Sequence, residues 1–452
     1  MQTIVSKFGG TSLADAKQIR KVQAIIEADP GRRFIVPSAP GKRHADDTKV
    51  TDLLYLCHEL ASRGLTFEEA FGPVCQRFRQ IVEALGLSLD LDPLLDEARE
   101  RIAYNGKHGL NADYAASRGE AINGRILAAL LDCDFIEPVD LIHFGADGRL
   151  DEPRTYAAVD ARLGNVGRAV VPGFYGMGPD GNVKTFSRGG SDVTGAIIAR
   201  GVGADVYENW TDVHGLLITD PRIVADAYTI EVVTYRELRE LSYSGASVLH
   251  EDAVFPVRDA GIPVNIRNTN DPEHPGTMIV GSDHPKAKIS YEITGIAGRK
   301  DFTIIQVEKS MMNSEIGFGK RVLEVLADYK ISFEHMPSGI DTLSVVVDDE
   351  ELEGKLDEVV AAIKAAVKPD KLEVDNNLAL IATVGRGMAH LPGMSAKLFG
   401  ALGDAGVNIR MIDQGSSELN IIVGVNMEQF ERAVIAIYQA FVSETTAPRV
   451  ID

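Results

Sequence analysis

The chain has 452 residues, of which 45% are hydrophobic and 25% are charged, and its formal net charge is −20. This length and composition predict a globular protein of two or three domains with large hydrophobic cores. The acidic balance argues against a nucleic-acid-binding surface, which requires clustered cations. Any anionic ligand must therefore be bound by a few locally placed groups.

Other patterns argue against further classes. The first residues lack the basic segment and apolar core of a signal peptide, and no apolar run approaches the roughly 18 residues of a membrane span. Cys57, Cys75 and Cys133 form no CxxC pair, and the ten histidines show no spacing typical of zinc ligands. We expect a cytoplasmic protein with no membrane partner, no disulfide framework and no structural zinc.

Up to about residue 290, apolar runs rich in β-branched residues alternate with helical patterns. The predicted strands are residues 3–8, 33–39, 133–142, 169–175, 205–213 and 263–266. The helices predicted between them include residues 14–29, 115–131 and 193–200. This alternation predicts an α/β fold whose mainly parallel sheet is covered on both faces. Ligands of such sheets bind beyond the carboxyl ends of strands, where the glycine-rich motifs of this chain occur.

The first motif is KFGGTS, residues 7–12, at the end of the first predicted strand. Gly9 and Gly10 let the backbone approach a ligand closely, and Lys7 provides a point charge for a phosphate. Thr11 or Ser12 would cap the helix that follows, whose first N–H groups attract anions. The motif fits a phosphate site or a plain capped turn. It is not a P-loop, because GxxxxGK[ST] does not occur in the chain.

A second motif, TFSRGGSD at residues 185–192, precedes another predicted helix. A helix start usually favours acids over cations, so Arg188 is a candidate for binding a carboxylate in bidentate fashion. Asp192 has an alternative role as the cap of that helix. 

Two acidic motifs complete the set. Glu120 ends SRGE at residues 117–120, in the first part of a predicted helix, where an acid is also commonplace. Asp212, Asp220 and Arg222 lie in WTDVHGLLITDPR, which follows a predicted strand. These side chains suit Mg²⁺ and phosphate, although Asp-Pro also marks an ordinary turn.

Beyond a polar linker at residues 281–290 the chain repeats itself. The segment from residue 302 aligns without gaps to the segment from residue 378, at a constant offset of 76. Each copy predicts a strand, a helix, two strands and a second helix. Two tandem βαββαβ units account best for this pattern. The predicted domains are residues 1–290, 301–376 and 377–452.

The motifs, in this order, resemble those of the aspartate kinases of the amino acid kinase superfamily, and the tandem units resemble that family's paired ACT domains. The resemblance covers essentially the whole chain. It implies an αβα sandwich, the amino acid kinase fold, followed by two ferredoxin-like ACT domains. It further implies that ATP phosphorylates L-aspartate to 4-phospho-L-aspartate, the first step towards lysine, threonine and methionine. Mg²⁺ with the nucleotide, feedback by lysine, threonine or both, and a homodimer or homotetramer would follow.

The resemblance also assigns roles to residues. The catalytic residues would be Lys7, Arg188 and Asp192. Arg188 would pair with the α-carboxylate of aspartate and Glu120 with its ammonium group, with further substrate contacts from Ser38, Thr51 and Ser191. The nucleotide would be bound by Lys7, Gly9, Gly10, Thr11, Ser12, Thr211, Asp212 and Arg222. Effector contacts are expected at Met312, Ser314, Gly317, Glu334, Asn408 and Gln414, although Met312 also suits a hydrophobic core and Glu334 a solvated strand.

The chain departs from the family pattern at several points. Ser247 and Glu251 replace a lysine that contacts ATP in many members and a nearby proline, and Leu217 replaces a tyrosine near the base. The segment 41–50 is long and charged, and we expect it to be a mobile cover for the aspartate site. Two other functions therefore stay open: a sister kinase acting on a related acid, and an amino-acid sensor that has lost activity.

Overall fold

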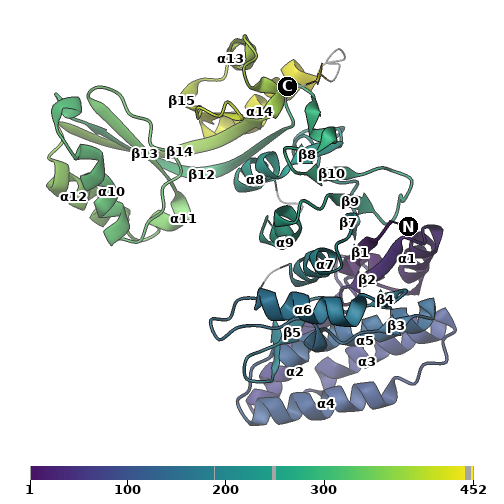
Figure 1. Ribbon diagram of the computed structural model, residues 1–452. Helices are drawn as coiled ribbons and strands as arrows, with labels where there is room; N and C mark the ends of the chain where they lie inside the picture. The colour runs from purple at the N-terminus through teal and green to yellow at the C-terminus, as the bar shows by residue number, and fades with distance from the viewer. Residues whose placement is uncertain (1, 188, 247–250, 443–448, 451–452) are drawn as a thin grey trace. The chain divides into compact units, whose positions relative to one another are not determined.

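The computed structural model describes residues 2–187, 189–246, 251–442 and 449–450 (Figure 1). These residues form two compact units. The first contains the described residues of 2–216, 229–235 and 251–287, and the second those of 217–228, 236–246 and 288–450. Three segments that the sequence placed in its first domain, residues 217–228, 236–246 and 288–290, thus belong to the second unit, and the division 1–290, 301–376 and 377–452 stays a prediction. No described helix is long and apolar enough to cross a membrane.

The first unit is built on an eight-stranded sheet with the order β3-β4-β2-β1-β7-β9-β10-β8. Its strands are β1 (Ile4–Phe8), β2 (Arg32–Pro37), β3 (Asp134–Phe135), β4 (Ala169–Val170), β7 (Val206–Thr211), β8 (Val232–Thr234), β9 (Val264–Asn268) and β10 (Thr277–Val280). Neighbouring strands run parallel except β9 and β10. The prediction of a mainly parallel sheet is confirmed, and β1, β2, β7 and β9 lie where the apolar runs placed them.

Two predicted strands are shorter than their apolar runs. Residues 133–142 form only β3 before a 3-10 turn, η2 (Pro138–Asp140), and residues 169–175 divide into β4 and β5 (Tyr175–Met177). A proline lies at each break, Pro138 and Pro172, and proline has no N–H to donate to a strand ladder. Strand β5 then pairs with β6 (Val183–Thr185) in a separate hairpin.

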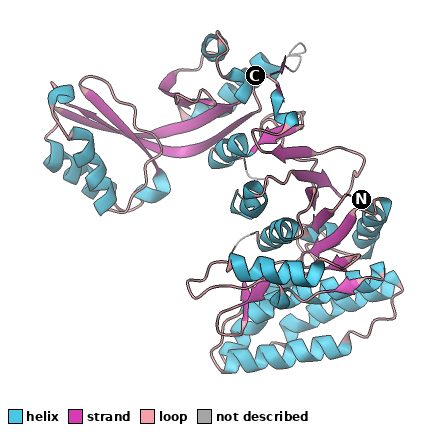
Figure 2. Ribbon diagram, viewed as in Figure 1, coloured by secondary structure: helices cyan, strands magenta, loops and turns pink. Residues whose placement is uncertain are grey.

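Helices cover both faces of the eight-stranded sheet (Figures 1 and 2). They are α1 (Ala16–Ala28), α2 (Val50–Ser62), α3 (Glu68–Leu85), α4 (Asp92–Lys107), α5 (Asp113–Leu131), α6 (Glu152–Leu163), α7 (Gly190–Gly201) and α9 (Phe255–Asp259). Successive residues of a strand point to opposite faces. On one face Phe8 and Ile35 lie in a core with α1, α3 and α5, and on the other Lys7 contacts α7. The arrangement is the predicted αβα sandwich.

The second unit contains a five-stranded antiparallel sheet with the order β13-β12-β14-β16-β15. Its strands are β12 (Gly295–Glu308), β13 (Thr342–Asp348), β14 (Lys371–Val384), β15 (Ile409–Asp413) and β16 (Asn420–Val425). Its helices are α8 (Tyr235–Tyr243), α10 (Phe318–Asp328), α11 (Asp349–Leu352), α12 (Leu356–Val367), α13 (Met394–Asp404) and α14 (Phe430–Val442). One core contains α10 and α12, and another contains α13 and α14. A short antiparallel pair, β11 (Ile289–Ser290) and β17 (Arg449–Val450), also belongs to this unit.

The internal repeat is confirmed at the level of whole elements. Strands β12 and β14 start 76 residues apart, and so do helices α10 and α13. The first copy differs in one respect, because its predicted second strand is not formed in the described residues 331–341, which make only isolated bridges from His335 and Ser338. Pro337 and Gly339 interrupt that segment. Strand β12 also begins before residue 301 and pairs along most of its length with β14, so both long strands serve both copies.

Candidate active site

The carboxyl ends of three parallel strands meet at one edge of the eight-stranded sheet. In the register of β1 with its neighbours, Phe8 lies opposite Pro37 of β2 and Trp210 of β7. The segments that follow these strands are therefore adjacent: Gly9 N donates to Trp210 O, and Ser38 N donates to Phe8 O. The sheet thus brings together Ser38, Thr211 and the turn that begins at Gly9 and Gly10, which we call the glycine turn. This is the position that the rule for parallel sheets predicted for a ligand site.

Lys7 lies at this edge with 7% of its surface exposed. Its ammonium group is 2.5 Å from a carboxylate oxygen of Asp192 and 3.4 Å from the amide oxygen of Asn209. Asn209 in turn donates to the same Asp192 oxygen at 2.9 Å. A side chain at Gly9 would come within 3.7 Å of the Lys7 nitrogen, so the cation lies directly against the glycine turn. Sequence reasoning missed Asn209, whose signal was a polar residue inside a buried strand.

Asp192 does not cap its helix, so that alternative is wrong. Gly189, with a left-handed φ of 55°, occupies the N-cap position of α7, and no side chain caps it. This turn leaves Asp192 in the first turn of α7, where its carboxylate faces Lys7. Arg188 lies outside the described residues.

The glycine turn differs from the capped turn that the sequence predicted. Residues Gly10–Leu13 form a short 3-10 turn, η1, and the cap of α1 is Asp15, whose carboxylate accepts from Gln18 N. Ser12 is buried and hydrogen-bonds Thr269 at 2.8 Å, whereas Thr11 is exposed. The expected capping by either residue is therefore wrong, because the 3-10 turn separates them from the helix start.

Gly10 makes a close backbone contact with Gly41. The Gly41 N–H donates to Gly10 O at 2.8 Å, and a β-carbon on Gly41 would lie 2.5 Å from the Gly10 carbonyl carbon. Only a glycine fits such an approach. The contact joins the glycine turn to the segment that follows β2.

Glu120 lies in the middle of α5 with 5% of its surface exposed. The Ala39 backbone hydrogen-bonds its carboxyl group, but its second oxygen has no partner among the described residues. Burial raises the pKa of Glu120 to about 8. Asn123, one turn further along α5, donates to Ser38 O at 2.7 Å. Helix α5 thus holds the segment after β2 and presents an acid that forms no ion pair with the described residues, although the charge of Arg118 lowers its pKa slightly.

Two other predicted substrate residues lie in first helical turns. Ser191 is buried in α7, where a β-carbon on Gly173 would be 2.5 Å from its hydroxyl oxygen. Thr51 is half-buried at the start of α2. Their contacts with a substrate stay a prediction.

The predicted nucleotide contacts are divided between the two units. Thr211 ends β7, and its hydroxyl hydrogen-bonds Asp212, which is exposed. Arg222 belongs to the second unit, where its largely exposed side chain pairs with Asp220. Leu217 belongs to the second unit as well, and Ser247 lies outside the described residues. The roles of Arg222 and Leu217 therefore stay predictions.

The predicted effector residues lie around the starts and ends of elements in the second unit. Met312 is buried in the core with Phe318, which agrees with its alternative role as a core residue. Glu334 is not a solvated strand residue, because its mostly buried carboxylate lies 3.3 Å from Arg299. Gly317 precedes α10 with a φ of 79°. The other predicted effector residues are exposed, namely Ser314, Asn408 and Gln414.

Comparisons with known proteins agree with this architecture. A family model described as the amino acid kinase family matches residues 2–268, and one described as an ACT domain matches residues 381–441. Aspartokinase 3 of Bacillus subtilis is 38% identical over 448 residues, covering 97% of this chain and 98% of that protein.

Solved structures give the same result. The crystal structure of Clostridium acetobutylicum aspartate kinase, described as an allosteric enzyme, superposes with a TM-score of 0.90 at 50% identity, covering 98% of this chain and 100% of that one. Escherichia coli aspartokinase III in complex with aspartate and ADP has the same fold, with a TM-score of 0.71 at 24% identity and coverage of 98% and 100%. The chain belongs to the amino acid kinase family and, within it, to the aspartate kinases.

Proposed function

We propose that this protein transfers the γ-phosphoryl group of ATP to the side-chain carboxylate of L-aspartate, giving ADP and 4-phospho-L-aspartate. The observation that carries the proposal is the Lys7 ammonium group, buried against a glycine turn where three parallel strands end. The similarity of this chain to aspartokinases, which extends over nearly its whole length, indicates that the substrate is aspartate. The product leads towards lysine, threonine and methionine.

The reaction needs positioning and charge neutralisation more than proton transfer. The attacking carboxylate has an ordinary pKa near 3.9, so it arrives deprotonated and requires no general base. One of its oxygens forms a bond to the γ-phosphorus while the bond to the bridging oxygen of ADP breaks. Lys7 and the N–H group of Gly10 would neutralise charge on the phosphates, whereas the Gly9 N–H already donates to Trp210 O. Asp192 and Asn209 hold the Lys7 ammonium group in place.

Aspartate would bind beside this turn. Arg188 would pair with the α-carboxylate and Glu120 with the ammonium group, while the hydroxyls of Ser38, Thr51 and Ser191 add hydrogen bonds. The buried Glu120 carboxyl, with one oxygen lacking a partner in the described part of the chain, supports this assignment. A substrate ammonium group would provide the charge that the site lacks.

Mg²⁺ would enter with ATP and neutralise charge on the nucleotide phosphates. Within the described residues, no group of three or more His, Cys, Asp or Glu side chains is placed to hold a metal. That fits Mg²⁺, which keeps several waters and is bound through substrate phosphates and one or two carboxylates. Asp192 and Asp212 are the carboxylates at this edge of the sheet.

The second unit would carry the feedback control. Lysine, threonine or both would bind to its ACT modules, with contacts from the predicted effector residues Met312, Ser314, Gly317, Glu334, Asn408 and Gln414. A homodimer or homotetramer would form through the same modules.

The pH dependence of aspartate binding tests the role of Glu120. In the folded, ligand-free protein its carboxyl stays protonated up to a pKa of about 8, and a bound ammonium group would ionise it. Binding therefore releases a proton below pH 8, so the KM for aspartate should fall by up to about tenfold per pH unit from pH 6 to 8 and then level off. The variant Glu120→Gln should show a higher KM with no such slope. An unchanged slope in Glu120→Gln would show that Glu120 does not bind the ammonium group of aspartate. The control is Glu59→Gln, at an exposed position of α2.

The overall activity is tested by trapping the acyl phosphate with hydroxylamine in the presence of ATP and Mg²⁺. Hydroxamate formed with L-aspartate is the expected result, and added lysine or threonine should identify the effector. Product with another acid but not with aspartate would identify a sister kinase. No product with any acceptor would favour the sensor function.

A further inference from the structure

The segment after β2 forms an exposed loop that borders both halves of the proposed site. We call residues 41–49 the substrate loop. It begins at Gly41, which contacts the glycine turn through Gly10, and it ends at α2, whose first turn carries Thr51. Among residues 42–49 every residue is exposed except Asp47. Asp47 is thus the single inward-facing side chain of this stretch.

Asp47 is bound by an arginine from another element. Arg77 lies on α3, is buried, and donates to a carboxylate oxygen of Asp47 at 2.6 Å. The same guanidinium donates to Gly41 O at 3.0 Å and approaches Ala14 O at 3.4 Å. Ala14 directly follows the 3-10 turn that begins at Gly10. One buried cation therefore joins α3, the substrate loop and the end of the glycine turn.

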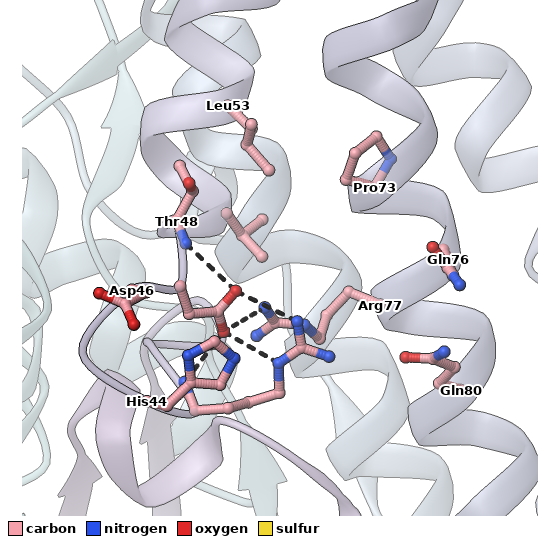
Figure 3. A pocket seen from close by; sticks show the side chains of 11 residues that line it. His44, Asp46, Thr48, Leu53, Pro73, Gln76, Arg77 and Gln80 are labelled. Atoms are coloured by element: carbon pink, nitrogen blue, oxygen red, sulfur yellow. Dashed lines mark hydrogen bonds and ion pairs between the residues drawn. The ribbon is translucent and has the colours of Figure 1, made fainter.

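A cavity lies beside this ion pair, between the loop and α3. Its volume is about 360 Å³, and it separates much of the loop from α3 (Figure 3). His44, Asp46 and Thr48 line it from the loop, and Pro73, Gln76 and Gln80 line it from α3. Because the loop does not pack closely against the helix there, its position depends on the polar contacts of Arg77.

Arg43 provides a second, local contact to Asp47. Its guanidinium donates at 2.9 and 3.1 Å, and its backbone N–H donates at 3.0 Å. The pKa of Asp47 lies well below its ordinary value, chiefly because Arg43 donates to it and also because Arg77 is nearby. Arg43 belongs to the loop itself, so this contact shapes the loop but does not tether it to α3.

We infer that Arg77 and Asp47 are positioning residues of the proposed phosphoryl transfer, which hold the substrate loop against the glycine turn and so place Thr51 for aspartate. Neither residue needs to touch a substrate. The inference rests on the proposed function, and it adds a pair of residues that acts from the helix behind the site.

Kinetics of three variants test the inference. Asp47→Asn should raise the KM for aspartate by about tenfold, because a displacement of about 1 Å in a bound substrate is costly, while the KM for ATP stays within about twofold. Arg77→Lys should raise the aspartate KM at least as much and also lower kcat, since a lysine cannot bridge Gly41 and Asp47 together. The matched control is Arg43→Gln, which removes the local contact and keeps the tether, and should change the aspartate KM less than about twofold.

Limited proteolysis supplies a readout that does not need activity. Endoproteinase Lys-C, which cleaves after lysine only, should cleave after Lys42 and Lys49 faster in Asp47→Asn than in the wild type, and Arg43→Gln, which removes no lysine, should leave the rate nearly unchanged. Faster cleavage in a protein that does not phosphorylate aspartate would uphold the tether and refute the proposed function. An unchanged aspartate KM and unchanged cleavage in Asp47→Asn would overturn the inference, as would an equal effect of Arg43→Gln. If Arg77→Lys fails to fold, Asp47→Asn decides the question.

Discussion

Replacing Lys7 with methionine should lower kcat by about 10²–10³-fold or more, because the proposed site loses the cation that would face the transferring phosphoryl group. Methionine keeps much of the length of the lysine stem without its charge, so the packing of β1 against α7 should survive. The hydroxamate assay at saturating aspartate and ATP measures the loss. Circular dichroism at the same temperature checks that the variant is folded.

A second variant distinguishes two effects of Lys7→Met: the loss of the cation itself, and the loss of the ion-pair partner of Asp192. Among the described residues, the carboxylate of Asp192 would retain only Asn209 as a partner in Lys7→Met. The double variant Lys7→Met with Asp192→Asn removes that orphan charge, and it should remain as inactive as the single variant. Recovery of activity in the double variant would show that Asp192, and not the missing cation, causes the defect. Lys107→Met, at an exposed position near the end of α4, is the control for loss of a positive charge.

Replacing Arg32 with leucine should destabilise the first unit by about 3–5 kcal/mol, because it leaves a buried carboxylate without its main partner. Glu208 lies in the middle of β7, and Arg32 donates to its two oxygens at 2.8 and 3.0 Å. Ser6 and Trp210 donate to the same carboxylate at 2.9 Å each. Although burial raises the pKa of Glu208, the arginine contacts outweigh it, and the net pKa lies below the ordinary value.

Trp210 makes this loss measurable in one unit of the chain. It is the single tryptophan, and its indole nitrogen donates to Glu208, so its fluorescence during urea unfolding reports on the first unit. A carboxyl with a lowered folded pKa stabilises the protein above its unfolded pKa and ceases to do so as the pH falls through the folded value. Without Arg32 the pKa of Glu208 should rise, so the defect should be larger at pH 8 than at pH 5. Arg63→Leu, which breaks the exposed pair with Glu59, should cost less than about 1 kcal/mol, and an equal cost would contradict the argument.

The sequence by itself determined the class of fold and predicted the places where chemistry should occur. Alternating apolar runs and helical patterns predict a parallel sheet, because burial on both faces and helical periodicity are local properties of the chain. The KFGGTS motif at the end of the first strand predicted an anion site for the same reason. The offset of 76 residues predicted two similar modules, and the helices α10 and α13 follow it at their first residues.

Only the tertiary structure decided which groups meet. Asp192 and Asn209 reach Lys7 from positions far along the chain, and the parallel register of β1 with β7 sets that meeting. The sequence alone left Asp192 as either a helix cap or a site residue, because its short-range context suits both. In the same way, no local pattern links Arg77 on α3 to the loop at Asp47, or assigns residues 217–228 to the second unit. Local patterns fix which face of an element is buried, whereas contacts between distant residues depend on register and on crossover connections that those patterns do not contain.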